Sequence, residues 1–93
     1  MLVLNLDITK EATDFVRGLD AKQFKQVMNK VLSLLSNPTP ADSRTLKGYE
    51  NHLRVDIGEH RIVYRFDNKQ VSILVIDKRN DDDVYRKLTR KNI

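Results

Sequence analysis

The apolar positions in the first half of the chain follow first a strand pattern and then helical spacing. A short apolar run predicts a strand at residues 2–6. Thr9 suits a helix N-cap, and the apolar residues after it recur at helical spacing: Ala12, Phe15, Val16 and Leu19. Asp20, with Gln23 three residues later, predicts the start of a second helix. Its apolar stripe, which we interpret as core packing, consists of Phe24, Val27, Met28, Val31 and Leu35.

Prolines at residues 38 and 40 end this helical pattern, and a polar loop is predicted up to about residue 51. The spacing then changes to strict alternation at residues 52–57, which predicts a strand. A two-residue turn with Gly58 first suits a type II′ hairpin, and residues 60–66 form the returning strand. Residues 71–76 are nearly all apolar, as in a central strand that is covered on both faces.

A last short helix is predicted after Asn80, which suits its N-cap. The acidic run at residues 81–83 would lie in the first turn, where carboxylates complement the helix dipole. This placement explains the acidic run, so we do not interpret it as a metal site.

The order strand, two helices, three antiparallel strands and short helix predicts an α+β fold. We expect the helices to pack on one face of a twisted sheet and the other face to stay partly open. Residues 1–93 are expected to form a single domain, because this length suits one small core and no linker separates the elements.

Composition excludes several classes of function. Hydrophobic residues make up 40% and charged residues 32% of the chain, as in ordinary soluble domains. The chain has no cysteine, which excludes disulfides, Cys-ligated zinc and a thiol nucleophile. Its two histidines argue against a multi-His metal site, so no metal or cofactor is expected. The longest apolar run, residues 73–76, is far shorter than a membrane span, and no signal peptide is evident, so we expect a cytoplasmic protein.

The positive charge is concentrated in the second half. The net charge is +4, with five basic and five acidic residues up to residue 43 and twelve basic and eight acidic residues after it. Such a region favours polyanionic partners. A solvated surface that keeps the protein soluble is the alternative, and charge alone does not separate the two.

Strand alternation predicts which side chains share the open face. The core-facing sets are Leu53, Val55 and Ile57 on one hairpin strand and Ile62, Tyr64 and Phe66 on the other. The opposite sets are His52, Arg54 and Asp56, and Arg61, Val63 and Arg65. With residues of the C-terminal part, the candidate catalytic set is His52, Arg54, Arg61, Arg79 and Tyr85.

This set suits chemistry on a phosphodiester. Arginines bind phosphate in bidentate fashion and stabilise charge as it builds on the phosphoryl oxygens. A tyrosine can stack on a base, and a histidine exchanges a proton near neutral pH. RNA supplies its own nucleophile, the 2′-hydroxyl, so no metal is required. Solvated arginines and histidines on an open sheet face are the alternative interpretation.

Several of these segments match one family in order and spacing. They are Leu46-Lys47-Gly48, Leu53-Arg54-Val55, the stretch from Gly58 to Tyr64, the stretch from Val75 to Arg79, and Val84-Tyr85. Together they resemble the RelE branch of the RelE/ParE toxin superfamily, over nearly the whole chain. The resemblance implies a RelE-like microbial RNase fold and the toxin of a type II toxin–antitoxin system. It further implies a ribosome-dependent endoribonuclease that cleaves mRNA in the A site without a metal and so inhibits translation.

The resemblance also implies roles for individual residues. Arg61 matches the arginine that stabilises the transition state, Arg79 the arginine at the leaving group, and Tyr85 the stacking tyrosine. His52 and Arg54 fall where the family often has two lysines, one of them a proposed base. Because arginine stays protonated, we expect His52 or Tyr85 to be the base and Arg54 to clamp phosphate.

Two more positions depart from the family pattern, and further basic residues are candidates for contacts. His60 stands where an aromatic residue is common, and Asp56 puts an acid into a strand that is often basic. The candidate RNA-binding residues are Lys47, Arg65 and Lys78. Weaker candidates for contacts with the ribosome or an antitoxin are Arg86, Lys87, Arg90 and Lys91, which could instead stabilise the end of the last helix.

The partners implied by the resemblance are a cognate antitoxin, RelB-like or of another family, and the ribosome with its mRNA. We expect no membrane partner, and operator DNA only indirectly through the antitoxin. Two alternative functions remain open: a ParE-like inhibitor of DNA gyrase, and an inactive homologue that acts only in operon autoregulation. The combination of Arg61, Arg79 and Tyr85 favours the nuclease.

Overall fold

The computed structural model describes residues 3–78 of the chain. The predicted last helix with its Asn80 cap lies outside the described residues. So do six candidate site residues: Arg79, Tyr85, Arg86, Lys87, Arg90 and Lys91.

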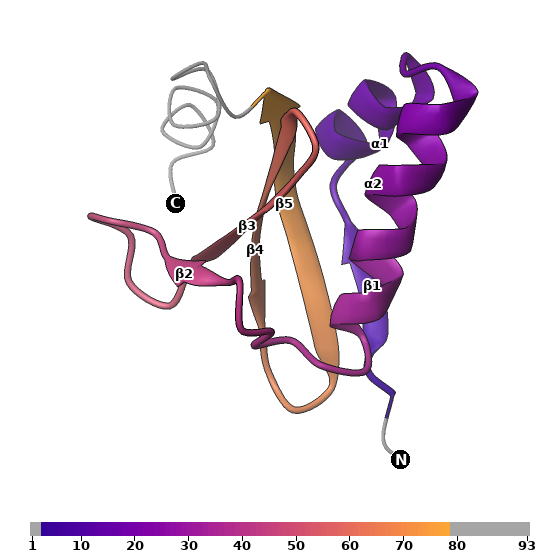
Figure 1. Cartoon of the computed structure of the whole chain (residues 1–93). Coiled ribbons are helices and arrows are strands. Elements are labelled where there is room, and N and C mark those ends of the chain that lie inside the picture. Colours follow the sequence, from indigo (N-terminus) through magenta and orange to yellow (C-terminus); the bar gives the residue numbers. More distant parts are fainter. Residues whose placement is uncertain (1–2, 79–93) are drawn as a thin grey trace.

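The described part is a five-stranded sheet with two helices on one side (Figure 1). The strands are β1 (Asn5–Ile8), β2 (Arg44–Thr45), β3 (Leu53–Ile57), β4 (His60–Phe66) and β5 (Gln70–Lys78). The helices are α1 (Lys10–Arg17) and α2 (Ala21–Leu34). The strand order is β1-β5-β4-β3-β2, with β1 parallel to β5 and the other neighbours antiparallel. The predicted α+β class is confirmed, and so is the order of strand, two helices and three antiparallel strands up to residue 78, apart from the added strand β2. The first strand lies at Asn5–Ile8 rather than residues 2–6.

Local side-chain chemistry starts both helices where the sequence indicated. The Thr9 hydroxyl accepts a hydrogen bond from the Ala12 N–H at 3.1 Å, and the Asp20 carboxylate accepts one from the Gln23 N–H at 2.8 Å. Each bond satisfies one of the backbone donors that a helix leaves unpaired at its first turn.

The main core lies between the helices and the sheet. Its fully buried members from the hairpin strands are Val55, Ile62 and Tyr64, as predicted. On α2 the buried residues are Val27, Val31 and Leu34, which follow i, i+4, i+7 spacing. The prediction for Phe24 was wrong: it lies in the first turn of α2, next to the connection from α1, and is 41% exposed.

The β3–β4 hairpin has the predicted turn. Ile57 pairs with His60 across two loop residues, and Gly58 has φ +58°, the left-handed value that a type II′ turn requires at its first position. A Cβ on Gly58 would lie 2.9 Å from Gln26 Oε1, so the turn also packs close to α2. His60 lies under this corner, with its ring edge-to-face against Phe15 at 5.7 Å between centroids.

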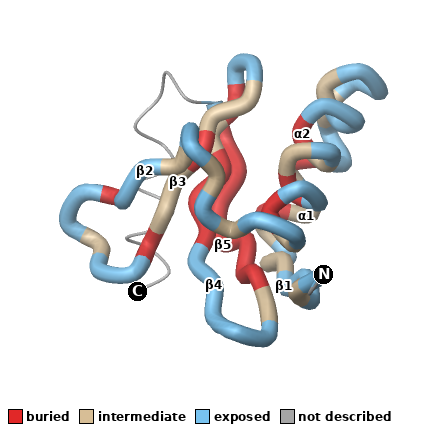
Figure 2. Tube along the Cα trace, turned by 60° about the horizontal axis from the view of Figure 1, so that its bottom comes forward, coloured by how far each residue is buried: buried red, intermediate tan, exposed pale blue. Residues whose placement is uncertain are grey.

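The second face of the sheet is less open than predicted. Residues 44–45, expected to lie in a loop, form β2 against β3. The segment that follows brings Leu46 and Tyr49 onto Val63, Leu74 and Val75, forming a small second cluster. Strand β5 contributes Val71, Ile73 and Ile76 to the main core and Leu74 and Val75 to the second cluster, and its pairing with β4 has a bulge between Val63 and Tyr64. Figure 2 shows this strand buried along most of its length. Neither described helix is long and apolar enough to cross a membrane.

Candidate functional site

The candidate residues of β3 and β4 form rows across the second face of the sheet. Asp56, Arg61 and Asp77 are in register across β3, β4 and β5. Arg54 is paired with Val63 in the next row. Since Leu53 pairs with Tyr64, the residue before it, His52, comes beside Arg65 at the far end. We call this arrangement of His52, Arg54, Asp56, Arg61 and Arg65 the polar ladder.

At one end of the ladder, Asp56 holds Arg61 in a two-point ion pair. Arg61 Nε donates to Asp56 Oδ1 at 2.9 Å, and Arg61 Nη2 donates to Asp56 Oδ2 at 3.4 Å. Arg54 Nη1 lies 3.9 Å from the same Oδ2. The prediction that Arg54 and Arg61 share one surface is therefore confirmed, and the unexpected acid Asp56 lies between their side chains.

At the other end, His52 is held in a defined tautomer. Its ring Nδ1 lies 2.6 Å from the Glu50 carbonyl oxygen, which can only accept, so Nδ1 carries the proton. The second nitrogen, Nε2, is buried with no hydrogen-bond partner among residues 3–78. The Tyr49 ring packs against the imidazole edge-to-face at 6.0 Å between centroids. In the neutral imidazole with its proton on Nδ1, Nε2 is the nitrogen that can accept a proton.

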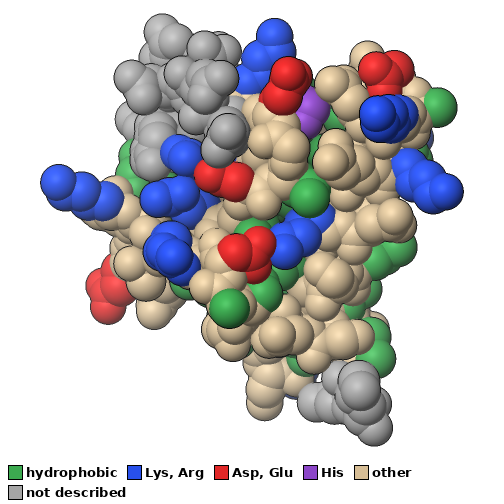
Figure 3. Space-filling model, viewed as in Figure 1, with side chains coloured by type: hydrophobic (Ala, Val, Ile, Leu, Met, Phe, Trp, Pro, Cys, Tyr) green, Lys and Arg blue, Asp and Glu red, His purple; other side chains and the backbone are tan. Residues whose placement is uncertain are grey.

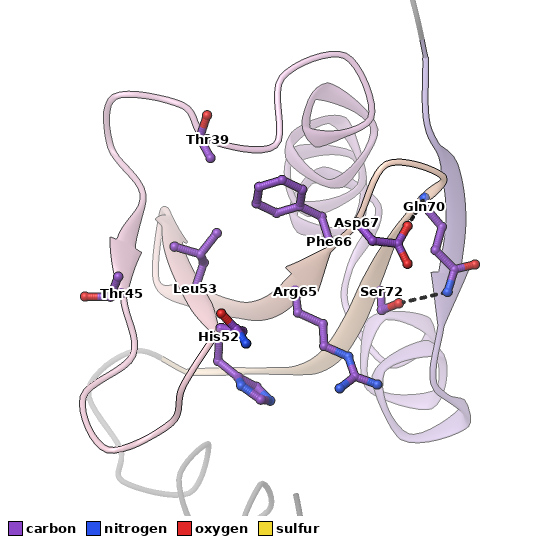
Figure 4. A pocket seen from close by; sticks show the side chains of 10 residues that line it. Thr39, Thr45, His52, Leu53, Arg65, Phe66, Asp67, Gln70 and Ser72 are labelled. Carbon is purple, nitrogen blue, oxygen red and sulfur yellow. Dashed lines mark hydrogen bonds between the residues drawn. The ribbon is translucent and has the colours of Figure 1, made fainter.

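A groove of about 640 Å³ opens beside this end of the ladder (Figure 4). It lies where β4 continues past the last β3–β4 pair, Leu53 with Tyr64. Its lining residues come from five segments: Thr39, Thr45, Asn51, His52, Leu53, Arg65, Phe66, Asp67, Gln70 and Ser72. The prediction that Phe66 faces the core was wrong, because the ladder has ended there and the ring is 40% exposed.

Two hydrogen-bonded anchors hold the walls of the groove. The Tyr64 hydroxyl donates to the Pro38 carbonyl at 2.7 Å and fixes the loop that carries Thr39. Burial raises the pKa of Tyr64 above its ordinary value. On the other side, the Asp67 carboxylate accepts from the backbone N–H groups of Lys69 and Gln70, and these bonds lower the pKa of Asp67.

The remaining described candidates are exposed and lie apart. Lys47 follows Leu46 in the segment over the second cluster, and Lys78 ends β5. His52 lies beside Arg65, which is four residues from Arg61 along β4. At 3.3 Å per residue, the backbone positions of His52 and Arg61 are therefore about 13 Å apart along the strands. In the space-filling view, Lys and Arg side chains gather on the β2 and β3 side, with acidic side chains among them (Figure 3). Among residues 3–78 no group of three or more His, Asp or Glu side chains could hold a metal ion.

A family model described as the ParE toxin of type II toxin–antitoxin systems (parDE) matches residues 6–83. The chain therefore belongs to this family, within the RelE/ParE superfamily. No curated protein sequence matches it significantly.

Solved structures confirm the RelE-like fold. A double mutant of the Escherichia coli toxin RelE in the free state superposes with a TM-score of 0.80, at 21% identity, covering 99% of this chain and 100% of that one. The RelBE2 toxin–antitoxin complex from Mycobacterium tuberculosis gives 0.72 at 23% identity, covering 87% and 97%. A YoeB/ParE toxin from Agrobacterium tumefaciens gives 0.70 at 20% identity, covering 81% and 98%.

Proposed function

We propose that this toxin is an endoribonuclease that cleaves mRNA on the ribosome and so inhibits translation in the cytoplasm. The observation that carries the proposal is the Nδ1 bond of His52 to the Glu50 carbonyl, which leaves Nε2 without a hydrogen-bond partner among residues 3–78, in the same ladder as three arginines. Attack by a ribose 2′-hydroxyl needs a nitrogen that accepts its proton and guanidinium groups that reach the phosphate. Arg54 and Arg65 are the arginines nearest to His52 along the ladder, and Arg61 must reach the phosphate from about 13 Å along the strands.

The proposed reaction needs no metal. The 2′-oxygen attacks the adjacent phosphorus while its proton passes to His52 Nε2. The bond from phosphorus to the 5′-oxygen breaks, and the 5′-oxygen takes a proton from water. The products are a 2′,3′-cyclic phosphate and a 5′-hydroxyl. Arg54 and Arg61 stabilise the charge that builds on the phosphoryl oxygens. Arg79 and Tyr85, by their resemblance to family residues, serve the leaving group and the stacked base.

The Asp56–Arg61 pair sets a condition on this reaction. A phosphate that binds Arg61 through its Nε–Nη2 edge competes with the Asp56 carboxylate, which occupies that edge at 2.9 Å and 3.4 Å. The hydroxyl must likewise displace neighbouring atoms to reach Nε2, because that atom is buried. The proposal therefore includes a rearrangement of side chains when RNA binds.

We further propose that a cognate antitoxin neutralises this toxin. Solved structures of similar fold include RelE or RelBE2 with RelB-type antitoxins, from Pyrococcus horikoshii and Mycobacterium tuberculosis. The basic residues Lys47, Arg65 and Lys78 are exposed here, where an acidic antitoxin segment or RNA could bind them. Contact with operator DNA would occur only through the antitoxin.

Primer extension on mRNA from a purified translation reaction tests the nuclease. Wild-type protein is expected to cut within codons only when ribosomes are present, and Arg61→Ala to abolish the cuts. Arg17→Ala, which removes an exposed arginine at the end of α1, is the matched control and should cut normally. His52→Ala should lower the rate and flatten its pH profile near neutrality. An unchanged profile would exclude His52 as the base.

A gyrase inhibitor is the second candidate, because the matching family model is that of ParE and because an acid neutralises Arg61. A supercoiling assay separates the two. Inhibited supercoiling together with uncut mRNA would favour the ParE-like function over the nuclease.

A further inference from the structure

The groove beside His52 combines three chemical features that the ladder alone does not explain. Phe66 exposes an aromatic ring, Arg65 an exposed guanidinium, and His52 contributes a buried acceptor without a partner among the described residues. All three line the same groove. Phe66 is 40% exposed and is therefore not a buried member of the hydrophobic core.

The topology explains why these residues can meet. Arg65 and Phe66 are neighbours on β4 and would normally point to opposite faces of the sheet. Because the β3–β4 pairing ends at Leu53 and Tyr64, no residue of β3 is paired with this end of β4. In Figure 4 the Arg65 and His52 side chains point to one side of this strand end and Phe66 to the other, so the groove reaches around the end of the pairing, with Thr39 and Thr45 on one side and Gln70 and Ser72 on the other.

The size and polarity of the groove suit one nucleotide. Its volume of about 640 Å³ lies within the range of roughly 300–1,000 Å³ that small-ligand sites occupy. Asn51 and Gln70 carry amides that can hydrogen-bond the edge of a base, and Gln70 Nε2 is already positioned by Ser72 Oγ at 3.3 Å. The acidic residue of the groove, Asp67, has its Oδ1 engaged by two backbone N–H groups of its own turn.

We propose that this groove binds a single nucleotide of RNA, with its base stacked on Phe66 and its phosphate on Arg65. A stacked aromatic side chain and an arginine are the usual pair of contacts to single-stranded RNA. The inference rests on the proposed function in one respect: the bound nucleotide is the one whose 2′-hydroxyl meets His52. Phe66, Asn51 and Gln70 then influence which base is accepted at that position.

The test is a binding measurement on the full-length protein that does not require cleavage. The probe is an RNA trinucleotide with 2-aminopurine in the middle, made 2′-deoxy there so that the nucleophile is missing. Stacking on Phe66 is expected to quench the 2-aminopurine fluorescence. Phe66→Ala should abolish the quench and weaken binding about ten-fold, whereas Phe66→Tyr, which keeps the ring, should preserve both.

Two matched controls isolate the contacts. Phe24→Ala removes an equally exposed phenylalanine, 41% against 40%, from α2 and should leave the quench intact. Arg65→Gln should keep the quench but reduce the slope of log affinity against log salt by about 0.7, the value for one phosphate contact on a single strand. Arg17→Gln should leave that slope unchanged.

Two results would overturn the inference: no quench with wild-type protein, or a quench and affinity that Phe66→Ala does not change. The outcome is independent of the nuclease assay. A Phe66-dependent quench in a protein that cuts no mRNA would support the groove and reject the nuclease. Ribosome-dependent cuts without such a quench would support the nuclease and reject the groove.

Discussion

The ion pair between Asp56 and Arg61 is predicted to contribute measurably to stability, although it lies near the surface. The side chain of Arg61 is 16% exposed and that of Asp56 is 29% exposed, so the pair is largely removed from water. Exposed pairs contribute roughly 0.2–1 kcal/mol, and breaking a fully buried pair costs about 3–5 kcal/mol. For Asp56→Asn, which keeps the shape and one acceptor oxygen, we expect a loss of about 1.5 kcal/mol, between these limits.

Thermal unfolding followed by circular dichroism measures this loss. In a domain of this size 1 kcal/mol shifts Tm by roughly 4–8 °C, so Asp56→Asn should lower Tm by about 6–12 °C. Asp14→Asn is the matched control, because Asp14 pairs with Lys10 at 2.7 Å with both side chains largely exposed. That variant should unfold close to the wild-type temperature. Equal Tm values for the two variants would refute the reasoning that burial strengthens the Asp56 pair.

The same substitution has a second expected effect if the toxin is a nuclease. Asp56→Asn removes a negative charge beside Arg54 and Arg61, so RNA should bind more tightly and KM should fall. Arg61 also loses the partner that orients its guanidinium, so kcat should fall as well. A parallel fall in both constants distinguishes this positioning role from simple destabilisation, and a raised KM would contradict it.

Further predictions concern the turn, the loop anchor and the alkaline range. Gly58→Ala should destabilise the fold by about 1–2 kcal/mol in urea unfolding, because Gly58 has φ +58° and a Cβ there would meet Gln26. The control is Gly18→Ala, because Gly18 has φ −85° and a Cβ there would make an ordinary contact with the Phe15 carbonyl oxygen at 3.5 Å. This variant should be as stable as wild type or more stable by up to about 1 kcal/mol. A loss of stability like that of Gly58→Ala would contradict the reasoning. Tyr64→Phe should cost about 1 kcal/mol at neutral pH, because the bond to the Pro38 carbonyl is lost. Burial raises the pKa of Tyr64, so the stability that the neutral hydroxyl contributes is complete below about pH 10 and is lost as the pH rises through the folded-state pKa. The difference in unfolding free energy between wild type and Tyr64→Phe should therefore narrow in the alkaline range. A difference that stays constant with pH would contradict this prediction.

Features that depend on neighbouring residues were readable from the sequence. Thr9 and Asp20 cap their helices through backbone groups three residues away, and Gly58 makes a turn whose geometry only two loop residues decide. The alternation at residues 52–57 likewise placed Arg54 and Asp56 on one face, because side chains in a strand alternate whatever the strand pairs with.

Features that depend on register or on distant segments were not readable. The two-residue strand Arg44–Thr45 exists only because the edge of β3 offers it partners. The exposure of Phe66 depends on where the β3–β4 pairing ends, and the ion pair of Asp56 with Arg61 depends on which residue of β4 lies opposite.

The sequence by itself thus determined the two helices, the strands other than β2 among residues 3–78, and the family, because these follow from local propensities and from motifs with fixed spacing. Only the tertiary structure decided how the candidate site is arranged. It showed that an acid lies between Arg54 and Arg61, that the buried Nε2 of His52 has no hydrogen-bond partner among residues 3–78, and that a groove opens beside it. These properties arise from contacts between residues distant along the chain, and such contacts form only once the strands have paired in one particular register.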